Sequence, residues 1–179
     1  MFTARFSLIF LSLLLLSGPV AAELVEIHLI DLLDEDRGYC LDIKGFKSKA
    51  KIERGLQAHT CYSSQGNIAV DQAFDSFVFG KNRLYLPAFD VCVRAELMGL
   101  TGSLKLQECM QEKLQKFGWD KKGRIYLIEN PSLCITAARG EARRGGGGSP
   151  RHLIRNISME QCSELLKPFQ QWGFRTISS

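Results

Sequence analysis

The sequence predicts an all-β domain made of three similar repeats. The first observation is that three cysteine pairs are each followed by a Gln-x-aromatic triplet, namely Gln72-Ala73-Phe74, Gln115-Lys116-Phe117 and Gln170-Gln171-Trp172. The second is that each repeat holds about four short runs of strand-forming residues bounded by turn residues. Twelve strands in three equivalent groups favour a closed barrel with pseudo-three-fold symmetry. An up-and-down barrel or a sandwich is the rival architecture, and it does not explain the triplication.

The strands of the three repeats can be placed in chain order from the apolar runs and the turn residues between them. The first repeat, about residues 24–80, is expected to have strands at 24–30, 39–43, 56–61 and 72–79, with a basic loop over 44–54. The second, about 81–122, has expected strands at 83–86, 90–95, 104–109 and 115–119. The third, about 123–176, has expected strands at 124–128, 132–137, 154–162 and 169–174, with a helical turn near 163–167.

The third repeat also carries a long loop over residues 139–151, which contains four consecutive glycines followed by Ser149 and Pro150. This composition predicts a flexible loop that does not pack. The predicted core consists of the triplet aromatics and the apolar strand positions: Phe74, Phe117, Trp172, Leu41, Ile43, Leu84, Leu86, Val93, Leu127 and Ile135.

The N-terminal segment, residues 1–22, has the layout of a secretory signal peptide. Arg5 precedes a short apolar run, and Gly18-Pro19 and small residues follow it. The run is too short to span a bilayer as a helix. No second long apolar stretch follows, so we expect no membrane span. The sequence thus predicts an exported protein, secreted or periplasmic, whose domain covers residues 23–179.

Six cysteines in an exported chain predict a disulfide framework. Six cysteines admit fifteen pairings, and the repeat selects the one in which each bond lies inside its own repeat. The expected bonds are Cys40–Cys61, Cys92–Cys109 and Cys134–Cys162. A zinc site is the rival interpretation, but the chain has no Cys-x-x-Cys and its three histidines are scattered. We therefore expect no metal and no cofactor.

The formal net charge of +4 is too small to predict a nucleic-acid partner. The two loops at 44–54 and 139–151 are locally basic, and such loops are most often solvated surface. The sharper interpretation is an anionic partner, such as a sulfated glycan, a lipid head group or a nucleic acid.

The chain resembles the ricin B-type lectins. The resemblance rests on Cys40-Leu41-Asp42, on the Leu-Gln-x-x-x-Cys run at 56–61 and on the three Gln-x-Phe/Trp triplets, and it extends from about Val25 to Phe174. It implies a β-trefoil fold and binding of glycans or glycoproteins, with galactose-type sugars as the expected ligands.

The resemblance also implies one sugar site, located in the first repeat. The matching positions are Asp42, Gln57, His59, Asp71 and Gln72, with His59 where a Trp is usual and Asp71 where an Asn is common. An ionised Asp accepts bonds from two adjacent hydroxyls, and an amide both donates and accepts. A flat ring matches the apolar face of a sugar. Convergence of Asp42, Gln57, His59 and Gln72 on one open pocket would favour the lectin, whereas burial of Asp42 against backbone donors would count against it. Protonation of His59 would make binding sensitive to pH.

The other two repeats lack the carboxylate at the position of Asp42. The second has Arg94 there and Lys105 in place of Gln57, and the third has Thr136 and Ser158. We therefore expect both sites to be degenerate, with Gln115 and Gln170 kept to bond the backbone near a turn.

Two other classes of function were weighed against a lectin. A trefoil that binds a protein partner or inhibits one through its loops is the alternative, favoured by the basic loops and the loss of two sites. An enzyme is not expected, because no nucleophile motif, phosphate-binding loop or metal set is present. Asn156-Ile157-Ser158 matches an N-glycosylation acceptor.

Overall fold

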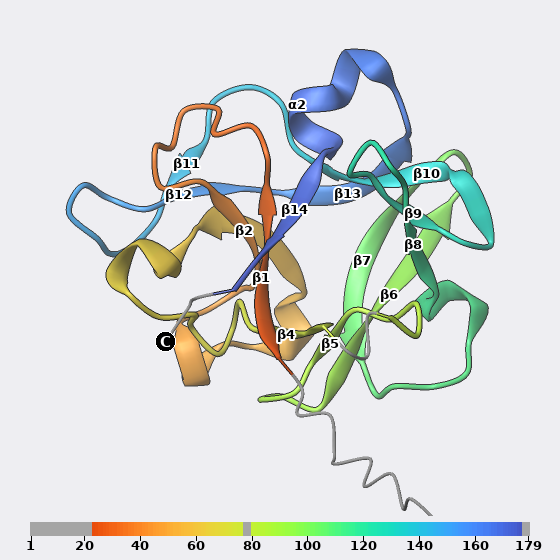
Figure 1. Ribbon diagram of the computed structural model, residues 1–179, viewed down its shortest axis with the longest axis horizontal. Coiled ribbons are helices and arrows are strands. Elements are labelled where there is room, and N and C mark those ends of the chain that lie inside the picture. Colours follow the sequence, from red (N-terminus) through yellow and green to blue (C-terminus); the bar gives the residue numbers. More distant parts are fainter. Residues whose placement is uncertain (1–22, 77–79, 177–179) are drawn as a thin grey trace, which may run out of the picture.

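Short antiparallel strands account for most of the regular structure in the computed structural model, which describes residues 23–76 and 80–176 (Figure 1). The first repeat contributes β1 (Leu24–Leu29), β2 (Tyr39–Ile43), β3 (Leu56–Thr60) and β4 (Phe74–Asp75). The second contributes β5 (Tyr85–Leu86), β6 (Val91–Met98), β7 (Thr101–Gln107) and β8 (Phe117–Trp119). The third contributes β9 (Ile125–Leu127), β10 (Asn130–Ala137), β11 (Arg143–Arg144), β12 (Leu153–Arg155), β13 (Ile157–Gln161) and β14 (Trp172–Arg175).

The helical elements with described bounds are single turns between the strands. These are the 3₁₀ turns Lys47–Lys49, Ile52–Arg54, Tyr62–Gln65, Lys113–Gln115 and Glu164–Leu166, and the α-helical turn α2 (Lys167–Gln170). No helix among residues 23–76 and 80–176 is long and apolar enough to cross a membrane. The signal peptide expected over residues 1–22 lies outside the described residues.

The strands form two curled sheets with the orders β11-β12-β3-β2-β1-β14 and β5-β6-β7-β13-β10-β9-β8, and β4 also pairs with β1. The first strand therefore meets the last, since Ile27 of β1 is the register partner of Phe174 in β14. Figure 1 shows β1 and β14 side by side at the front of the molecule. The all-β prediction is confirmed.

Two details of the third repeat differ from the expected strands. The strand expected over 154–162 is divided at Asn156 into β12 and β13, which pair in different sheets. The strand expected over 169–174 begins only at Trp172, because the Gln170 side chain accepts a bond from the N–H of Ser163 and the chain turns there as α2. The divided strand matters for function, because β12 joins the sheet of the first repeat.

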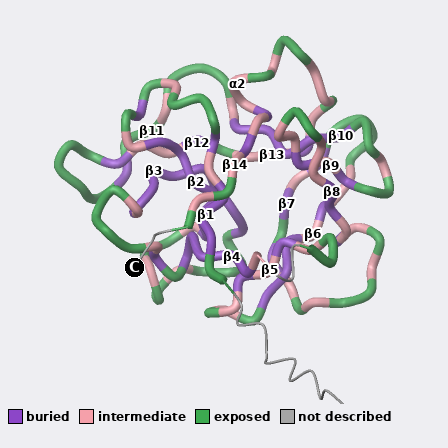
Figure 2. The backbone as a smooth tube through the Cα atoms, in the orientation of Figure 1, coloured by how far each residue is buried: buried purple, intermediate pink, exposed green. Residues whose placement is uncertain are grey.

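The core lies between the sheets and contains every residue that the sequence predicted for it (Figure 2). Phe74, Phe117 and Trp172, the triplet aromatics, are 1%, 0% and 0% exposed. The indole N–H of Trp172 donates to the carbonyl of Ile135 at 2.9 Å, so burial leaves this polar group paired. The three disulfides of the structure are Cys40–Cys61, Cys92–Cys109 and Cys134–Cys162.

The triplet glutamines have one structural role, repeated three times. In each repeat the amide oxygen accepts from the N–H of the residue after the second cysteine, as Gln115 does from Met110 at 2.7 Å. The amide nitrogen donates to the carbonyl of the residue before that cysteine, as Gln115 does to Glu108 at 2.8 Å. The expectation that these side chains bond backbone near a turn is confirmed, and it explains why all three are buried.

Candidate functional site

Asp42 and Gln57 face each other across the strand pair β2–β3, where they are register partners. The Gln57 amide donates to one carboxylate oxygen of Asp42 at 2.8 Å, and the Gln72 amide donates to the other at 3.0 Å. Asp42 is 2% exposed. Burial, followed by the nearby charge of Asp71, raises the pKa of Asp42 well above its ordinary value, although both amide bonds oppose the shift.

A cavity of about 380 Å³ lies above this pair. It is lined by Gly45, Phe46, Gln57, His59, Tyr62, Gly146, Gly147, Gly148, His152 and Ile154. Two of the five predicted site residues, Gln57 and His59, therefore face the cavity. Asp42 and Gln72 are not part of this lining: Asp42 is buried and accepts from Gln57 and Gln72, both side-chain donors. The convergence on one open pocket that would favour a lectin is therefore met by Gln57 and His59 and not by these two. The physical reason is that Gln72 is already committed to the backbone of Thr60 and Tyr62.

Three aromatic rings pack together on one side of the cavity. The rings of His59 and Tyr62 are stacked, with centroids 5.3 Å apart and an interplanar angle of 28°. The ring of His152 contacts both edge-on, at 5.1 Å from His59 and 5.2 Å from Tyr62. Burial raises the pKa of Tyr62 to about 12, and the charges of Asp42 and Asp71 add to the shift. The three side chains therefore form one aromatic cluster, in which the rings of His59 and Tyr62 are stacked and the ring of His152 packs edge-on against both.

His59 is neutral at physiological pH. It is 7% exposed, and burial lowers its pKa to about 4 despite a bond from its ring to the carbonyl of Thr60 at 2.9 Å. Because a carbonyl only accepts, Nδ1 carries the proton, which leaves Nε2 as an acceptor. The expected pH sensitivity of binding required His59 to gain its proton near neutral pH. The lowered pKa moves this protonation to acidic pH.

Asp71, the fifth predicted residue, is fully buried and holds a loop in place. One carboxylate oxygen accepts a hydrogen bond from the backbone N–H of Lys47, and the other has no partner among the described residues. Lys47 adopts a left-handed conformation with φ 49°. This conformation is uncommon for a side chain with a Cβ, and the bond to Asp71 stabilises it. Asp71 therefore positions the segment that carries Gly45 and Phe46 at the cavity wall.

The glycine stretch of the third repeat forms the part of the wall next to His152. The N–H of Gly145 donates to the carbonyl of His152 at 2.7 Å, and the N–H of His152 donates to Gly147 at 2.9 Å. Gly148 has φ +87°, and a Cβ there would lie 2.3 Å from the His152 ring. The expectation that this loop does not pack is wrong at Gly145 and Gly148, because the lack of a side chain lets their backbone lie against His152. The expected flexibility of the loop stays a prediction.

Two arginines fasten the ends of the loop at 139–151. Arg155 donates to the carbonyls of Ala138 and Gly140 at 2.9 and 2.6 Å, and it pairs with Asp34 of the first repeat at 2.6 Å. Arg37 donates to the carbonyls of Pro150 and Arg151 at 3.0 and 3.2 Å. The loop is therefore tied to the turn at 34–38.

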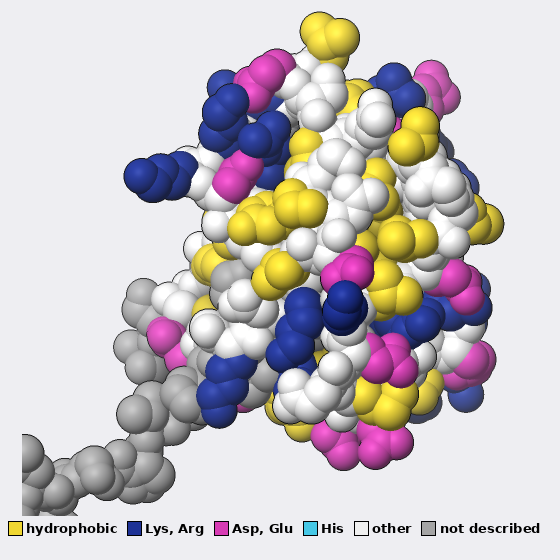
Figure 3. Space-filling view, turned by 90° about the vertical axis from the view of Figure 1, so that its right-hand side faces the viewer, with side chains coloured by type: hydrophobic (Ala, Val, Ile, Leu, Met, Phe, Trp, Pro, Cys, Tyr) yellow, Lys and Arg dark blue, Asp and Glu magenta, His cyan; other side chains and the backbone are white. Residues whose placement is uncertain are grey.

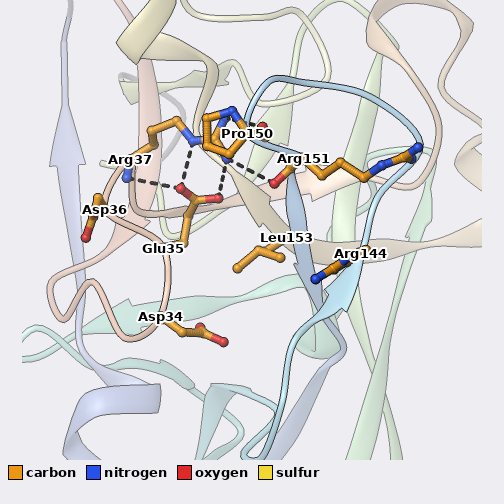
Figure 4. A pocket seen from close by; sticks show the side chains of 8 residues that line it. All are labelled: Asp34, Glu35, Asp36, Arg37, Arg144, Pro150, Arg151 and Leu153. Atoms are coloured by element: carbon orange, nitrogen blue, oxygen red, sulfur yellow. Dashed lines mark hydrogen bonds and ion pairs between the residues drawn. The ribbon is translucent and has the colours of Figure 1, made fainter.

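Arg37 is itself oriented by Glu35, at 2.7 Å (Figure 4). Burial raises the pKa of Glu35, but bonds from Arg37 and Thr60 outweigh it and lower the pKa overall. The hydroxyl of Thr60 donates to Glu35 at 2.6 Å and accepts from the N–H of Leu153 at 2.8 Å. A second cavity of about 480 Å³ lies beside this ion pair, lined by Asp34, Glu35, Asp36, Arg37, Arg144, Pro150, Arg151 and Leu153.

The cavity beside Gln57 is therefore shared by the first and third repeats. Ile154 of β12 is the register partner of His59 in β3, which brings His152 and the glycine stretch beside the first repeat. Sequence reasoning missed Phe46, Tyr62, His152 and Ile154 as cavity residues. The position of Tyr62, directly after the second cysteine, was an available signal, whereas the residues from the third repeat have no counterpart in the other two.

The equivalent positions of the other repeats are occupied by paired side chains. Arg94 forms an ion pair with Glu112 at 2.9 Å, and Lys105 with Glu96 at 2.7 Å. Thr136 is buried and accepts from the Gln170 amide at 2.8 Å. Figure 3, the face on the right of Figure 1, shows acidic, basic and apolar side chains interspersed. Neither repeat places a carboxylate at the position of Asp42.

Comparison with known proteins identifies the fold. No family model matches the sequence, and no curated protein sequence matches it significantly. The solution structure of the mdaA-1 domain has a TM-score of 0.61 at 17% identity, covering 87% of this chain and 91% of that one. The earthworm R-type lectin C-half in complex with GalNAc has a TM-score of 0.57 at 14% identity, covering 86% and 98%.

A further solved structure, the Vibrio vulnificus hemolysin/cytolysin β-trefoil lectin with N-acetyl-D-lactosamine bound, has a TM-score of 0.54 at 14% identity. It covers 89% of this chain and 98% of its own. At these identities the likeness concerns the fold, and the chain is a β-trefoil that shares its architecture with R-type lectins. The predicted fold class is confirmed.

Proposed function

We propose that the protein is a ricin B-type lectin whose sugar site is the cavity lined by Gln57, His59 and Tyr62. The observation that carries the proposal is that an oriented amide and two stacked rings border one cavity. Its volume of about 380 Å³ lies in the range of small-ligand pockets, about 300–1,000 Å³. The fold shared with sugar-binding trefoils supports the same conclusion.

The chemistry of the lining suits a sugar ring. The Gln57 amide uses a nitrogen to bond Asp42, so its carbonyl oxygen and its remaining N–H are left to bind neighbouring hydroxyls. The Nε2 atom of His59 can accept a hydrogen bond from a hydroxyl group. The parts of the His59 and Tyr62 rings that border the cavity offer apolar surface to the C–H face of a pyranose. In this arrangement Asp42 acts through Gln57, as a positioning residue, and does not touch the sugar.

Galactose-type sugars are the first ligands to test. GalNAc and N-acetyl-D-lactosamine, which two of the similar structures hold, both contain a galactose-type ring. A single site of this kind binds a monosaccharide weakly, so useful affinity requires several sites or several chains. The proposal includes no catalysis, because the lining residues bind and orient a sugar without a nucleophile.

The proposal also includes export. The signal peptide at residues 1–22 would deliver the domain at 23–179 to an oxidising compartment. Three disulfides are consistent with such a compartment.

A glycan array of the purified protein tests the function, with Gln57→Ala as the site variant. Ser158→Ala is the matched control, because Ser158 holds the equivalent position in the third repeat, four residues before the second cysteine. Binding to galactose-type glycans that Gln57→Ala abolishes and Ser158→Ala preserves supports the lectin. Absence of binding to every glycan contradicts it and favours a trefoil that binds a protein partner through its loops.

A further inference from the structure

Both basic loops contribute residues to the lining of the same cavity. The loop at 44–54 supplies Gly45 and Phe46 to its lining, and the loop at 139–151 supplies Gly146 to Gly148. The first loop has five Lys or Arg residues against one Glu, and the second has four Arg against one Glu. The formal net charge of the whole chain is only +4, so the remainder of the chain is net negative. Positive charge is therefore concentrated around this site.

The cations of the two loops are close to one another. Burial lowers the pKa of Lys44, and the charges of Arg143 and Arg54 lower it further, which places cations of both loops within electrostatic reach. Within the described part of the chain, no salt bridge pairs a Lys or Arg of these loops with a carboxylate. By contrast, Arg94 and Lys105 of the second repeat each have an acidic partner. Among the described residues the loop cations therefore form no ion pair, although two buried acids, Asp42 and Asp71, lie close to the cavity and the charge of Lys47 acts on Asp71.

Lys47 does not itself line the cavity; it lies next to two rings that do, and it borders a neighbouring pocket. Its Nζ lies 5.5 Å from the ring centroid of Phe46 and 5.7 Å from that of Tyr62, and both rings line the cavity. The left-handed backbone of Lys47, with φ 49°, is held by the buried carboxylate of Asp71. The left-handed backbone conformation of Lys47 costs conformational free energy, which the bond to buried Asp71 offsets. Such strained conformations are concentrated at binding sites.

The glycine wall fits an anion as well. Gly146 and Gly147 line the cavity, and each has no atom within 4 Å of where a Cβ would lie. The absence of side chains there lets a ligand approach this backbone, as in glycine-rich anion-binding loops.

We propose that the cavity binds an acidic sugar, a galactose-type ring bearing a carboxylate or a sulfate, with the anionic group at Lys47 and the ring against His59 and Tyr62. This inference rests on the proposed lectin function and names the class of its ligand. The remaining loop cations then raise the local concentration of acidic glycans, and salt weakens this long-range attraction.

Isothermal titration calorimetry with two matched pairs of sugars tests the inference. The first pair is the methyl glycosides of galacturonic acid and galactose, and the second is galactose 6-sulfate and galactose. At low salt the acidic member of at least one pair should bind on the order of tenfold more tightly than its neutral counterpart. Which pair shows the preference distinguishes a carboxylate ligand from a sulfate ligand.

Lys47→Gln should bring the affinity for the acidic sugar down to about that for the neutral one. Lys121→Gln, an exposed lysine outside both loops, should keep the preference and controls for net charge. Equal affinities for the acidic and neutral sugars in the unmodified protein overturn the inference and leave the lectin intact. A preference that survives Lys47→Gln also overturns it. Absence of binding to all the sugars contradicts the lectin function itself.

Discussion

The side-chain amide of Gln57 donates to the buried carboxylate of Asp42 at 2.8 Å, across the strand pair that forms the floor of the cavity. Asp42 is therefore a support for the residue that faces the ligand. Its other oxygen is held by Gln72, which the backbone of Thr60 and Tyr62 fixes in turn. The orientation of the Gln57 amide thus depends on a chain of buried hydrogen bonds. Mutations in this chain can change sugar binding without preventing the protein from folding.

Asp42→Asn should uncouple stability from sugar binding. The backbone bonds of Gln72 keep its NH₂ group pointing at residue 42, so the side-chain oxygen of the introduced Asn must accept from it. The NH₂ group of this Asn then points at Gln57, whose amide must flip to present its oxygen. The folded-state pKa of Asp42 is raised, so the stability that Asp42 contributes is full below its unfolded pKa and lost as the pH rises through the folded pKa. Asn removes this loss.

Urea unfolding should therefore show Asp42→Asn at least as stable as the unmodified protein at pH 7, with a relative gain that grows with pH. Sugar affinity should fall several-fold. Asp42→Ala removes one hydrogen-bond acceptor from each of the amides of Gln57 and Gln72, and it should lose roughly 1–3 kcal/mol for each donor left unpaired. An Asn variant as unstable as the Ala variant would contradict the arrangement of donors around Asp42.

His59 should make the fold sensitive to acid. Its folded pKa of about 4 lies below the unfolded value of 6.5, so its stabilising contribution is full above pH 6.5 and is lost as the pH falls toward 4. A difference of this size corresponds to roughly 3 kcal/mol. His59→Phe removes this contribution and keeps the ring.

Unfolding free energies measured at pH 7.5 and pH 4.5 check the effect. The unmodified protein should lose on the order of 2 kcal/mol more than His59→Phe between the two values. Equal losses would show that His59 is accessible to protons in the folded protein.

Arg37→Ala should release the loop at 139–151 from the first repeat. The variant loses the two bonds to the carbonyls of Pro150 and Arg151, and it leaves Glu35 without its ion partner. Hydrogen exchange followed by mass spectrometry should show faster exchange over residues 145–152, with several-fold weaker sugar binding. Arg94→Ala, which breaks the ion pair with Glu112 in the second repeat, is the control and should leave that segment unchanged.

Alanine substitutions at the neighbouring residues Gly147 and Gly148 should have different effects on stability. Gly148→Ala places a Cβ 2.3 Å from the His152 ring at φ +87°, so it should cost roughly 1–3 kcal/mol and displace the ring. Gly147→Ala meets no atom within 4 Å and should change stability by less than about 0.5 kcal/mol. Chemical denaturation of the two variants measures the contrast, and similar costs at both positions would contradict the packing of Gly148 on His152.

The fold could be predicted from the sequence because the signal is repeated. Each triplet glutamine bonds the backbone on either side of a second cysteine, and each triplet aromatic is buried, so three copies of one physical requirement appear as three copies of one motif. The disulfide pairing follows from the same repetition.

The site could be predicted only in part. Gln57 and His59 line the cavity as their positions in β3 suggested, but burial redirects Asp42, Asp71 and Gln72 to hold other residues. His152 and Gly148 could not be found from the repeat, because they belong to a loop that the other copies lack. Their approach to His59 depends on the pairing of β12 with β3, a long-range contact with no local sequence pattern.

The central claim is that the cavity between the first and third repeats binds a sugar. A titration of the isotopically labelled protein with methyl galactoside and methyl galacturonide, followed by the backbone amide signals in NMR spectra, tests it most directly. The account predicts saturable shifts of the amide signals of Phe46, Lys47, His59, Tyr62 and the stretch 146–148. The signals of Lys105 and Ser158, which hold the position of Gln57 in the other two repeats, should change little. Shifts confined to another surface, or none at high sugar concentration, would contradict it.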